Sequence, residues 1–219
     1  MADLFSRRNS MTTLSKYRTG NTPTWCPGCG NFLLMQGLQK CFADQNINTK
    51  NIVAVHDIGC AGNMADFIHS YGVHTLHGRV VPVAMGVKLH NPKLTVLCVG
   101  GDGGIYGEGL NHLVTAARAN IDIKVFVSNN FLYSLTTGQT SPTTPYQART
   151  KSTPQGSDLI PLKAVELIRK VNPQVFAQTA TSQNLKDLFE KIKKTMRHKG
   201  FALLDIETDC LTFGKQLKQ

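Results

Sequence analysis

Four short apolar runs, each rich in β-branched residues, recur along the chain. They cover residues 51–57, 94–99, 123–128 and 201–207. Apolar runs of this length, with little alternation between apolar and polar positions, are typical of strands buried on both faces of a parallel sheet. The pattern therefore predicts four buried, parallel strands.

Longer segments between and around these runs have apolar residues at helical spacing. They cover residues 31–43, 79–90, 108–120, 161–171 and 185–198. Because strands alternate with helices, we expect an α/β fold, with a mostly parallel sheet and helices on both faces, as a single domain of residues 1–219.

The helix expected at residues 185–198 is amphipathic. Leu188, Ile192 and Met196 recur at helical spacing, and lysines lie between them. This pattern predicts a surface helix with a solvated basic face. Docking of an acidic electron carrier on that face stays open as an alternative.

Residues suited to chemistry follow the end of each predicted strand. In chain order they are Gly59-Cys60, Gly101-Asp102-Gly103, Asn129-Asn130 and Asp209-Cys210. The carboxyl ends of strands form the edge at which open α/β sheets bind their ligands. We therefore expect one site built from four loops.

A long polar segment, residues 134–153 (SLTTGQTSPTTPYQARTKST), directly follows the asparagine pair. It has no apolar period and exceeds the length of an ordinary connection. Its position favours a functional loop that folds over the site rather than a disordered stretch.

Composition narrows the class of protein. No stretch of the 219 residues is long and apolar enough to span a membrane, and no apolar run follows the basic residues near the N-terminus, so we expect a cytoplasmic protein. The net charge of +10 allows nucleic acid, an acidic protein or an anionic small molecule as partner. Six cysteines in a reducing compartment indicate metal binding, catalysis or burial rather than disulfides.

The glycine–aspartate–glycine triplet at 101–103 and the asparagine pair at 129–130 are separated by a helix and a strand. This spacing brings a carboxylate and an amide oxygen together, and both are ligands that suit Mg²⁺ holding a diphosphate. The glycines leave room for phosphate oxygens near the backbone. The spaced motif resembles the thiamine-diphosphate motif of thiamine-dependent enzymes. That resemblance implies Asp102, Asn130 and the backbone carbonyl of Leu132 as Mg²⁺ ligands, with Ser134 where a glycine is more usual.

The cysteines at 26 and 29 form a C-x-x-C pair, and Cys60 and Cys210 stand at the predicted strand ends. Four thiolates suit zinc or a [4Fe–4S] cluster equally well, so these residue types alone leave the metal open. Cys41 and Cys98 lie in an apolar helix face and an apolar strand, and we expect both to be buried.

Several segments resemble, in chain order, the signatures of the β subunits of 2-oxoacid:ferredoxin oxidoreductases. They are residues 22–31 (TPTWCPGCGN), 57–63 (DIGCAGN), 74–79 (HTLHGR) and 210–213 (CLTF), with Leu211 where proline is usual. The resemblance extends over residues 16–213 and implies a thiamine-diphosphate-binding fold. It implies a [4Fe–4S] cluster held by Cys26, Cys29, Cys60 and Cys210. It also implies cofactor contacts by Ile58, Gly59, Cys60, Ala61, His77, Gly101, Gly103, Gly104, Ser134 and Leu135.

The activity implied by the resemblance is oxidative decarboxylation of pyruvate or 2-oxoglutarate to an acyl-CoA and CO₂. Electrons would pass from thiamine diphosphate through the cluster to ferredoxin. The family takes its activating glutamate from a separate pyrimidine-binding domain, and the helix position of Glu108 does not suit that task. We therefore expect a heterodimer with an α partner, no activity of this chain alone, and no catalytic residue assigned within it.

Three other classes of protein compete with this interpretation. A non-redox thiamine-dependent decarboxylase subunit would carry zinc or no metal at the cysteines. A basic Cys₄ zinc module for nucleic acid fits the charge, but aromatic residues, 7% of the chain, are too few and scattered for a stacking platform, so we expect no nucleic-acid partner. A dinucleotide-binding domain would need a glycine where Tyr106 stands.

Overall fold

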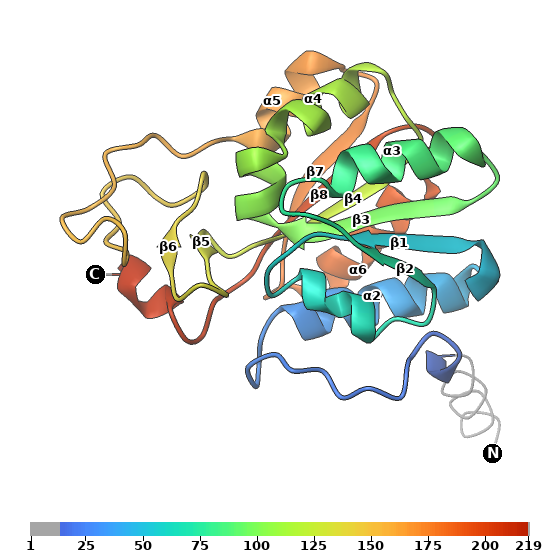
Figure 1. The fold of residues 1–219 in the computed structure, drawn as a ribbon, viewed down its shortest axis with the longest axis horizontal. Helices are drawn as coiled ribbons and strands as arrows, with labels where there is room; N and C mark the ends of the chain where they lie inside the picture. The colour runs from blue at the N-terminus through green and yellow to red at the C-terminus, as the bar shows by residue number, and fades with distance from the viewer. Residues whose placement is uncertain (1–13, 219) are drawn as a thin grey trace.

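A computed structural model of the chain describes residues 14–218, so the expectation about the first ten residues lies outside the described part. Six parallel strands form one sheet in the order β2-β1-β3-β4-β8-β7 (Figure 1). Their bounds are β1 Ile52–His56, β2 Tyr71–His74, β3 Thr95–Gly101, β4 Lys124–Asn129, β7 Phe176–Thr181 and β8 Ala202–Glu207.

Helices cover both faces of the sheet, as predicted (Figure 1). On one face lie α3 (Val80–His90), α4 (Leu110–Arg118) and α5 (Ala164–Val171), and on the other lie α2 (Asn31–Asp44) and α6 (Leu185–Arg197). Short helical turns occupy η1 Thr49–Asn51, η2 Gly62–Asp66, η3 Gly103–Glu108 and η4 Gly214–Lys218. A small hairpin, β5 (Leu132–Tyr133) with β6 (Gln139–Thr140), begins the long polar segment.

The four predicted strands are the four central strands of the sheet. In β1, Val53 and Val55 belong to the core beneath α3 and α4, whereas Ile52 and Ala54 belong to the core beneath α2 and α6. A fully buried side chain of this kind contributes about 1.5–3 kcal/mol, which is why such strands contain few polar residues. The prediction of buried parallel strands is confirmed.

The two edge strands were missed by the sequence pattern. Every residue of β2 is exposed, and in β7 only Ala177 and Ala180 are buried. An edge strand has a neighbour on one side only and does not need a continuous apolar sequence. Their existence depends on pairing with β1 and β8, which a local pattern does not reveal.

Helix α6 packs against α2 through its apolar face, as its periodicity predicted. Leu188, Ile192 and Met196 are buried. A Cβ atom at Gly37 of α2 would come within 2.4 Å of the Ile192 side chain, so the glycine permits a close approach of the two helices. Within residues 14–218, no helix combines the length and apolar character that a membrane span requires.

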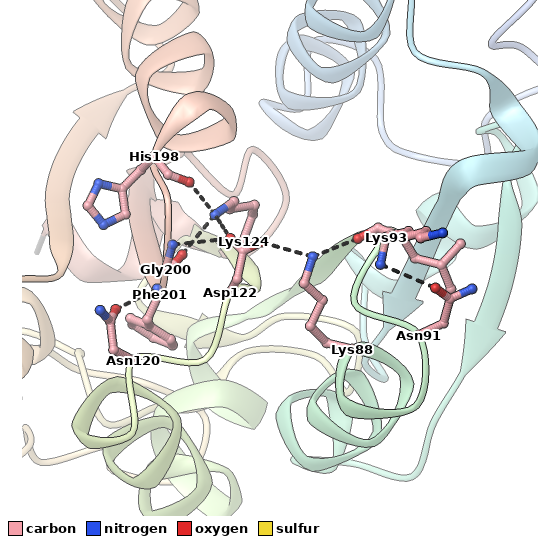
Figure 2. A network of polar contacts seen from close by, with 10 residues as sticks. Lys88, Asn91, Lys93, Asn120, Asp122, Lys124, His198, Gly200 and Phe201 are labelled. Carbon is pink, nitrogen blue, oxygen red and sulfur yellow. Dashed lines mark hydrogen bonds and ion pairs between the residues drawn. The ribbon is translucent and has the colours of Figure 1, made fainter.

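The amino-terminal edge of the sheet is closed by a polar network around Asp122 (Figure 2). The ammonium group of Lys124 donates to Asp122 at 2.5 Å and to the backbone carbonyls of His198 and Gly200. Lys88 of α3 reaches the other carboxylate oxygen of Asp122 at 2.8 Å. The network joins the loops that precede β4 and β8 and lies at the opposite edge from the predicted site.

Candidate cofactor site

A pocket opens at the carboxyl ends of the adjacent strands β1, β3 and β4. It is lined by residues 58–61 after β1, by His77, by residues 101–104 after β3, and by Ser128, Asn130 and residues 132–136 around the end of β4. Every position to which the resemblance gave a cofactor contact lines this pocket, and so do Asp102, Asn130 and Leu132. Three of the four expected loops therefore meet at one pocket.

Asp102 presents a buried carboxylate at the pocket. Burial raises the pKa of this carboxyl group, and hydrogen bonds from Thr143 and Ser141 partly offset the effect. Thr143 lies in the long polar segment, and its hydroxyl is 2.7 Å from Asp102 Oδ2 and 2.9 Å from Asn129 Oδ1. The segment is thus ordered over the site, as its position predicted.

The asparagine pair shapes the turn that follows β4. Asn129 Oδ1 accepts a hydrogen bond from the backbone of Phe131, which has a positive φ of 64°. Asn130 Oδ1 accepts from the backbone of Leu132 at 3.2 Å and from the Ser134 hydroxyl at 2.9 Å. Each amide oxygen therefore holds the backbone two residues ahead, an arrangement that asparagine favours.

A second buried carboxylate, Asp205 of β8, lies behind this turn. Its Oδ2 accepts from the Tyr106 hydroxyl at 2.8 Å and faces the amide of Asn129 at 3.4 Å. Its Oδ1 is buried without a hydrogen-bond partner among the described residues. Burial raises the pKa of Asp205 to about 6. Sequence reasoning missed Asp205 because it lies inside an apolar strand.

The two glycines after Asp102 have a packing role. A Cβ atom at Gly103 would come within 2.4 Å of the Tyr133 ring, and one at Gly104 would come within 2.0 Å of Asp57 Oδ2. Glycine is required at both positions because other side chains occupy the space. Gly101 differs, since a Cβ atom there would lie 3.9 Å from the nearest atom, the backbone carbonyl oxygen of Ser128, which leaves the Gly101 backbone open for the approach of a ligand.

Asp57 connects the loop after β1 to the loop that carries His77. It is fully buried, and its Oδ1 accepts from the backbone N–H groups of Ile58 and Gly78, both at 2.9 Å. Burial raises the pKa of Asp57 in spite of these bonds. His77 itself contacts Glu108 at 3.0 Å and lies beside the Tyr133 ring. Asp57 begins the DIGCAGN segment and Tyr133 follows the asparagine pair, so both lie in segments that resemble the family, but their structural roles in the site were not predicted.

The oxygen atoms at the pocket fit a hard divalent cation. A carboxylate, an amide oxygen and a backbone carbonyl, from Asp102, Asn130 and Leu132, line the same pocket. A cation beside Asp102 would also relieve the cost of a buried negative charge. Asn130 Oδ1 already accepts two hydrogen bonds, so the bond from Ser134 would be exchanged for the metal.

The four singled-out cysteines gather at a corner beside the pocket. The pKa of the Cys60 thiol is raised to about 11, first by burial and then by the charges of Cys29, Cys210 and Cys26. The Cys26 sulfur lies 3.2 Å from the Thr212 hydroxyl, and a Cβ atom at Gly28 would come within 3.1 Å of the Leu211 side chain. The C-x-x-C turn and the segment after Cys210 are therefore neighbours.

The sulfur atoms do not enclose a common centre in this structure. Across the part of the chain that the structure describes, no three histidine, cysteine, aspartate or glutamate side chains are arranged to hold a metal ion. The thiol chemistry fits a thiolate-bound centre, and the sulfurs would have to draw together around it. Cys41 and Cys98 are buried, as predicted.

Comparisons with known proteins agree with this geometry. A family model described as thiamine pyrophosphate enzyme, C-terminal TPP binding domain, matches residues 57–206. The β subunit of the 2-oxoacid:ferredoxin oxidoreductase of Saccharolobus solfataricus is 41% identical over 195 residues, which cover 87% of this chain and 63% of that protein. The 2-oxoglutarate synthase subunit KorB of Archaeoglobus fulgidus is 35% identical, with 89% of this chain and 73% of that protein covered.

A solved structure shares the fold over nearly the whole chain. It is the 2-oxoglutarate:ferredoxin oxidoreductase from Magnetococcus marinus with 2-oxoglutarate, coenzyme A and succinyl-CoA bound. The TM-score is 0.87 at 35% identity, and the match covers 91% of this chain and 68% of that one. The chain spans less than two thirds of the length of the Saccharolobus relative. The motifs, the parallel sheet and these relatives agree: the chain belongs to the family of thiamine-pyrophosphate-binding β subunits of 2-oxoacid:ferredoxin oxidoreductases.

Proposed function

We propose that this chain is the thiamine-diphosphate-binding subunit of an enzyme that oxidatively decarboxylates 2-oxoglutarate or pyruvate to an acyl-CoA and CO₂. The observation that carries the proposal is the pocket, at which the oxygen ligands of residues 102, 130 and 132 meet the cysteine-bearing loop after β1. The relative from Magnetococcus marinus, which has 2-oxoglutarate and coenzyme A bound, supports the substrate class.

Thiamine diphosphate would lie in this pocket with its diphosphate held through Mg²⁺. Asp102, Asn130 and the carbonyl of Leu132 would hold the metal, and Thr143 would keep the Asp102 carboxylate in place. When bound, the cofactor supplies the carbanion chemistry that releases CO₂. The chain's own residues bind and orient it, because the activating glutamate is expected from the α partner.

Cys26, Cys29, Cys60 and Cys210 would hold a [4Fe–4S] cluster beside the pocket. Such a cluster accepts electrons one at a time and would pass them to ferredoxin. Support for this assignment comes from the four thiols, which gather from three loops, and from the mutual effect of their charges on the Cys60 pKa. A reducing cytoplasmic location agrees with six free cysteines and is part of the proposal.

The mouth of the pocket suits a protein partner. Ile58, Leu76 and Leu135 are large apolar side chains with exposed fractions of 38%, 79% and 52%. Apolar side chains that gather around a pocket mark binding surfaces more often than isolated ones do. We assign this rim to the α subunit that completes the active site.

The test is metal analysis of the chain purified without oxygen together with its α partner. We expect about four iron and four sulfide per chain, lost in Cys210→Ala and retained in the buried control Cys41→Ala. Formation of acyl-CoA from 2-oxoglutarate or pyruvate should depend on Mg²⁺, thiamine diphosphate and a ferredoxin. One zinc without sulfide would instead favour a non-redox thiamine enzyme.

A further inference from the structure

All three residues of the His77-Gly78-Arg79 triplet contact Glu108. The Nδ1 atom of His77 lies 3.0 Å from Glu108 Oε2, and Arg79 donates to the backbone carbonyl of Glu108 at 3.0 Å. Gly78 has a positive φ of 71°, and a Cβ atom there would come within 2.6 Å of the Glu108 Cβ. His77 and Arg79 therefore hold the carboxylate and the backbone carbonyl of Glu108, and Gly78 packs closely against its Cβ atom.

A π-helical turn brings Glu108 to this position. Residues Gly103–Glu108 form the turn, closed by a hydrogen bond of 2.8 Å from the backbone N–H of Gly109 to the carbonyl of Gly104. A Cβ atom at Gly109 would lie 3.1 Å from the carbonyl oxygen of Gly78, so the turn and the triplet are in close contact. π-helical turns are frequent at functional sites because the extra residue redirects a side chain.

This contact fixes the histidine ring. An ionised carboxylate only accepts hydrogen bonds, so the His77 Nδ1 that faces Glu108 carries the proton. The ring also lies against Tyr133, with 5.9 Å between centroids. In residues 14–218, Nε2 has no hydrogen-bond partner, and His77 lines the cofactor pocket. A neutral ring held in this way offers the lone pair of Nε2 to a ligand.

The pair stands where the pocket meets solvent. The side chains of His77 and Glu108 are 35% and 50% exposed. Asp102 and Asp57, in contrast, are buried deeper in the site. A ligand that arrives after the cofactor can therefore reach Nε2 from the open side.

We infer that His77 is the base that takes the proton of the incoming coenzyme A thiol and that Glu108 is the residue that positions it. The inference rests on the proposed function for the identity of this co-substrate, which is the ligand of that reaction with an S–H group. The S–H bond breaks, its proton passes to Nε2, and the sulfur keeps the electron pair with which it bonds to the acyl carbon. The bond between the acyl carbon and the cofactor breaks, and its electron pair returns to the cofactor as the leaving group. The two electrons of the oxidation pass one at a time to ferredoxin, the acceptor of the proposed function. A carboxylate that orients a histidine base is a common arrangement for activating a thiol or hydroxyl.

The first test asks whether Glu108 controls the histidine, independently of activity. The full chain is labelled with ¹⁵N-histidine, and two-bond ¹H–¹⁵N correlations report which ring nitrogen is protonated, with the His77 signals identified in His77→Gln. We expect His77 to carry its proton on Nδ1 in the original chain. Glu108→Ala should shift it toward Nε2, whereas Glu190→Ala, on the remote helix α6, should change nothing. An unchanged tautomer in Glu108→Ala would overturn the positioning role.

The second test separates the two halves of the reaction in the complex with the α partner. His77→Gln should lower kcat/KM for coenzyme A roughly 100-fold, and Glu108→Gln should lower it roughly tenfold. Because His77 also lines the cofactor pocket, single-turnover reduction of ferredoxin by the 2-oxoacid without coenzyme A is measured at saturating thiamine diphosphate. In each variant it should fall by much less than kcat/KM for coenzyme A, and both steps should stay within about twofold in the control His112→Gln. Equal slowing of both halves, or of the first half alone, would overturn the role as thiol base.

Failure of the proposed function and failure of the assignment of His77 as the thiol base would give different results. A complex that forms no acyl-CoA even with unchanged residues contradicts the proposed function, and the tautomer measurement still decides whether Glu108 holds His77. A complex that forms acyl-CoA with an undiminished kcat/KM for coenzyme A in His77→Gln retains the proposed function and eliminates the base.

Discussion

At the scale of single residues, Thr143 is the polar side chain that ties the long loop to Asp102. Its hydroxyl lies 2.7 Å from the carboxylate, in a buried position. Replacing Thr143 with valine keeps the shape of the side chain but removes the hydrogen-bond donor that holds the Asp102 carboxylate in position. Losing this hydrogen bond to a charged group should cost about 1–2 kcal/mol. We expect Thr143→Val to weaken binding of thiamine diphosphate with Mg²⁺ roughly tenfold, as measured by calorimetry on the α–β complex.

A neighbouring threonine provides the matched control. Thr150 is equally buried in the same loop but contacts only the hydroxyls of Thr140, Ser152 and Thr153 and nearby backbone. Thr150→Val should leave cofactor affinity within about twofold of that of the original chain. It should lower thermal stability about as much as Thr143→Val does. Equal loss of affinity in both variants would mean that cofactor binding depends on the order of the loop and not on the hydrogen bond from Thr143 to Asp102.

Asp205 predicts a dependence of stability on pH. Burial raises its pKa from 3.8 to about 6, so between these values the folded chain retains a proton that the unfolded chain has released. Its contribution to stability is complete below pH 3.8 and is lost as the pH rises through 6. Relative to Asp205→Asn, the original chain should lose up to about 3 kcal/mol of unfolding free energy between pH 4 and pH 7.

Urea unfolding of both chains at the two pH values measures this difference. Asparagine can keep the bond from Tyr106, and its amide group faces the place where Oδ1 has no partner among the described residues. A difference between the chains that does not change with pH would show that Asp205 is ionised over the whole range.

At the scale of elements, two glycines in helical segments differ in whether the space around them admits a side chain. Gly104 lies in the π-helical turn η3, where a Cβ atom would meet Asp57 Oδ2 at 2.0 Å. Gly86 lies within α3, and nothing lies within 4 Å of its Cβ position. We expect Gly104→Ala to destabilise the chain by about 2–3 kcal/mol and Gly86→Ala to stabilise it by roughly 0.5–1 kcal/mol. Thermal unfolding of the two variants would contradict this account if both changed stability in the same direction.

Elements also differ in how well their sequence predicts them. The central strands and α2, α3, α5 and α6 follow from apolar periodicity, because each buries an apolar face. The helix expected at residues 108–120 begins only at Leu110, and its first residues belong to the π-helical turn. Gly78 and Asp57, which are distant in sequence, pack against that turn, and a local pattern does not reveal such contacts.

At the scale of the whole molecule, the amino-terminal and carboxyl-terminal ends of the strands have different roles, stability and cofactor binding. The amino-terminal edge holds Lys124, whose side chain is only 7% exposed, by its contact with Asp122. Removing that carboxylate leaves two poorly solvated ammonium groups. Asp122→Ala should therefore destabilise the chain by about 2–3 kcal/mol, less than for a fully buried pair because Asp122 is partly exposed.

Affinity for thiamine diphosphate should be unchanged in Asp122→Ala, since the network lies where β4 and β8 begin, whereas the pocket is lined by residues at the carboxyl ends of the strands. Asp158→Ala, at an exposed position in a loop, serves as the control and should change neither property. Loss of cofactor affinity without loss of stability would contradict the separation of the two edges.

By itself, the sequence determined the α/β fold, the central strands, the family and most of the residues that line the pocket. The fold and the strands follow from apolar periodicity, whereas the family and the pocket residues follow from the resemblance of several motifs to the signatures of a known family. Only the tertiary structure decided the edge strands and the contacts of His77, Gly78 and Arg79 with Glu108. It also decided the series of hydrogen bonds that connects Asp205 to Asp102 through Asn129 and Thr143. Such contacts join side chains that are distant in sequence, and their partners become neighbours only when the parallel strands align their carboxyl ends at one edge.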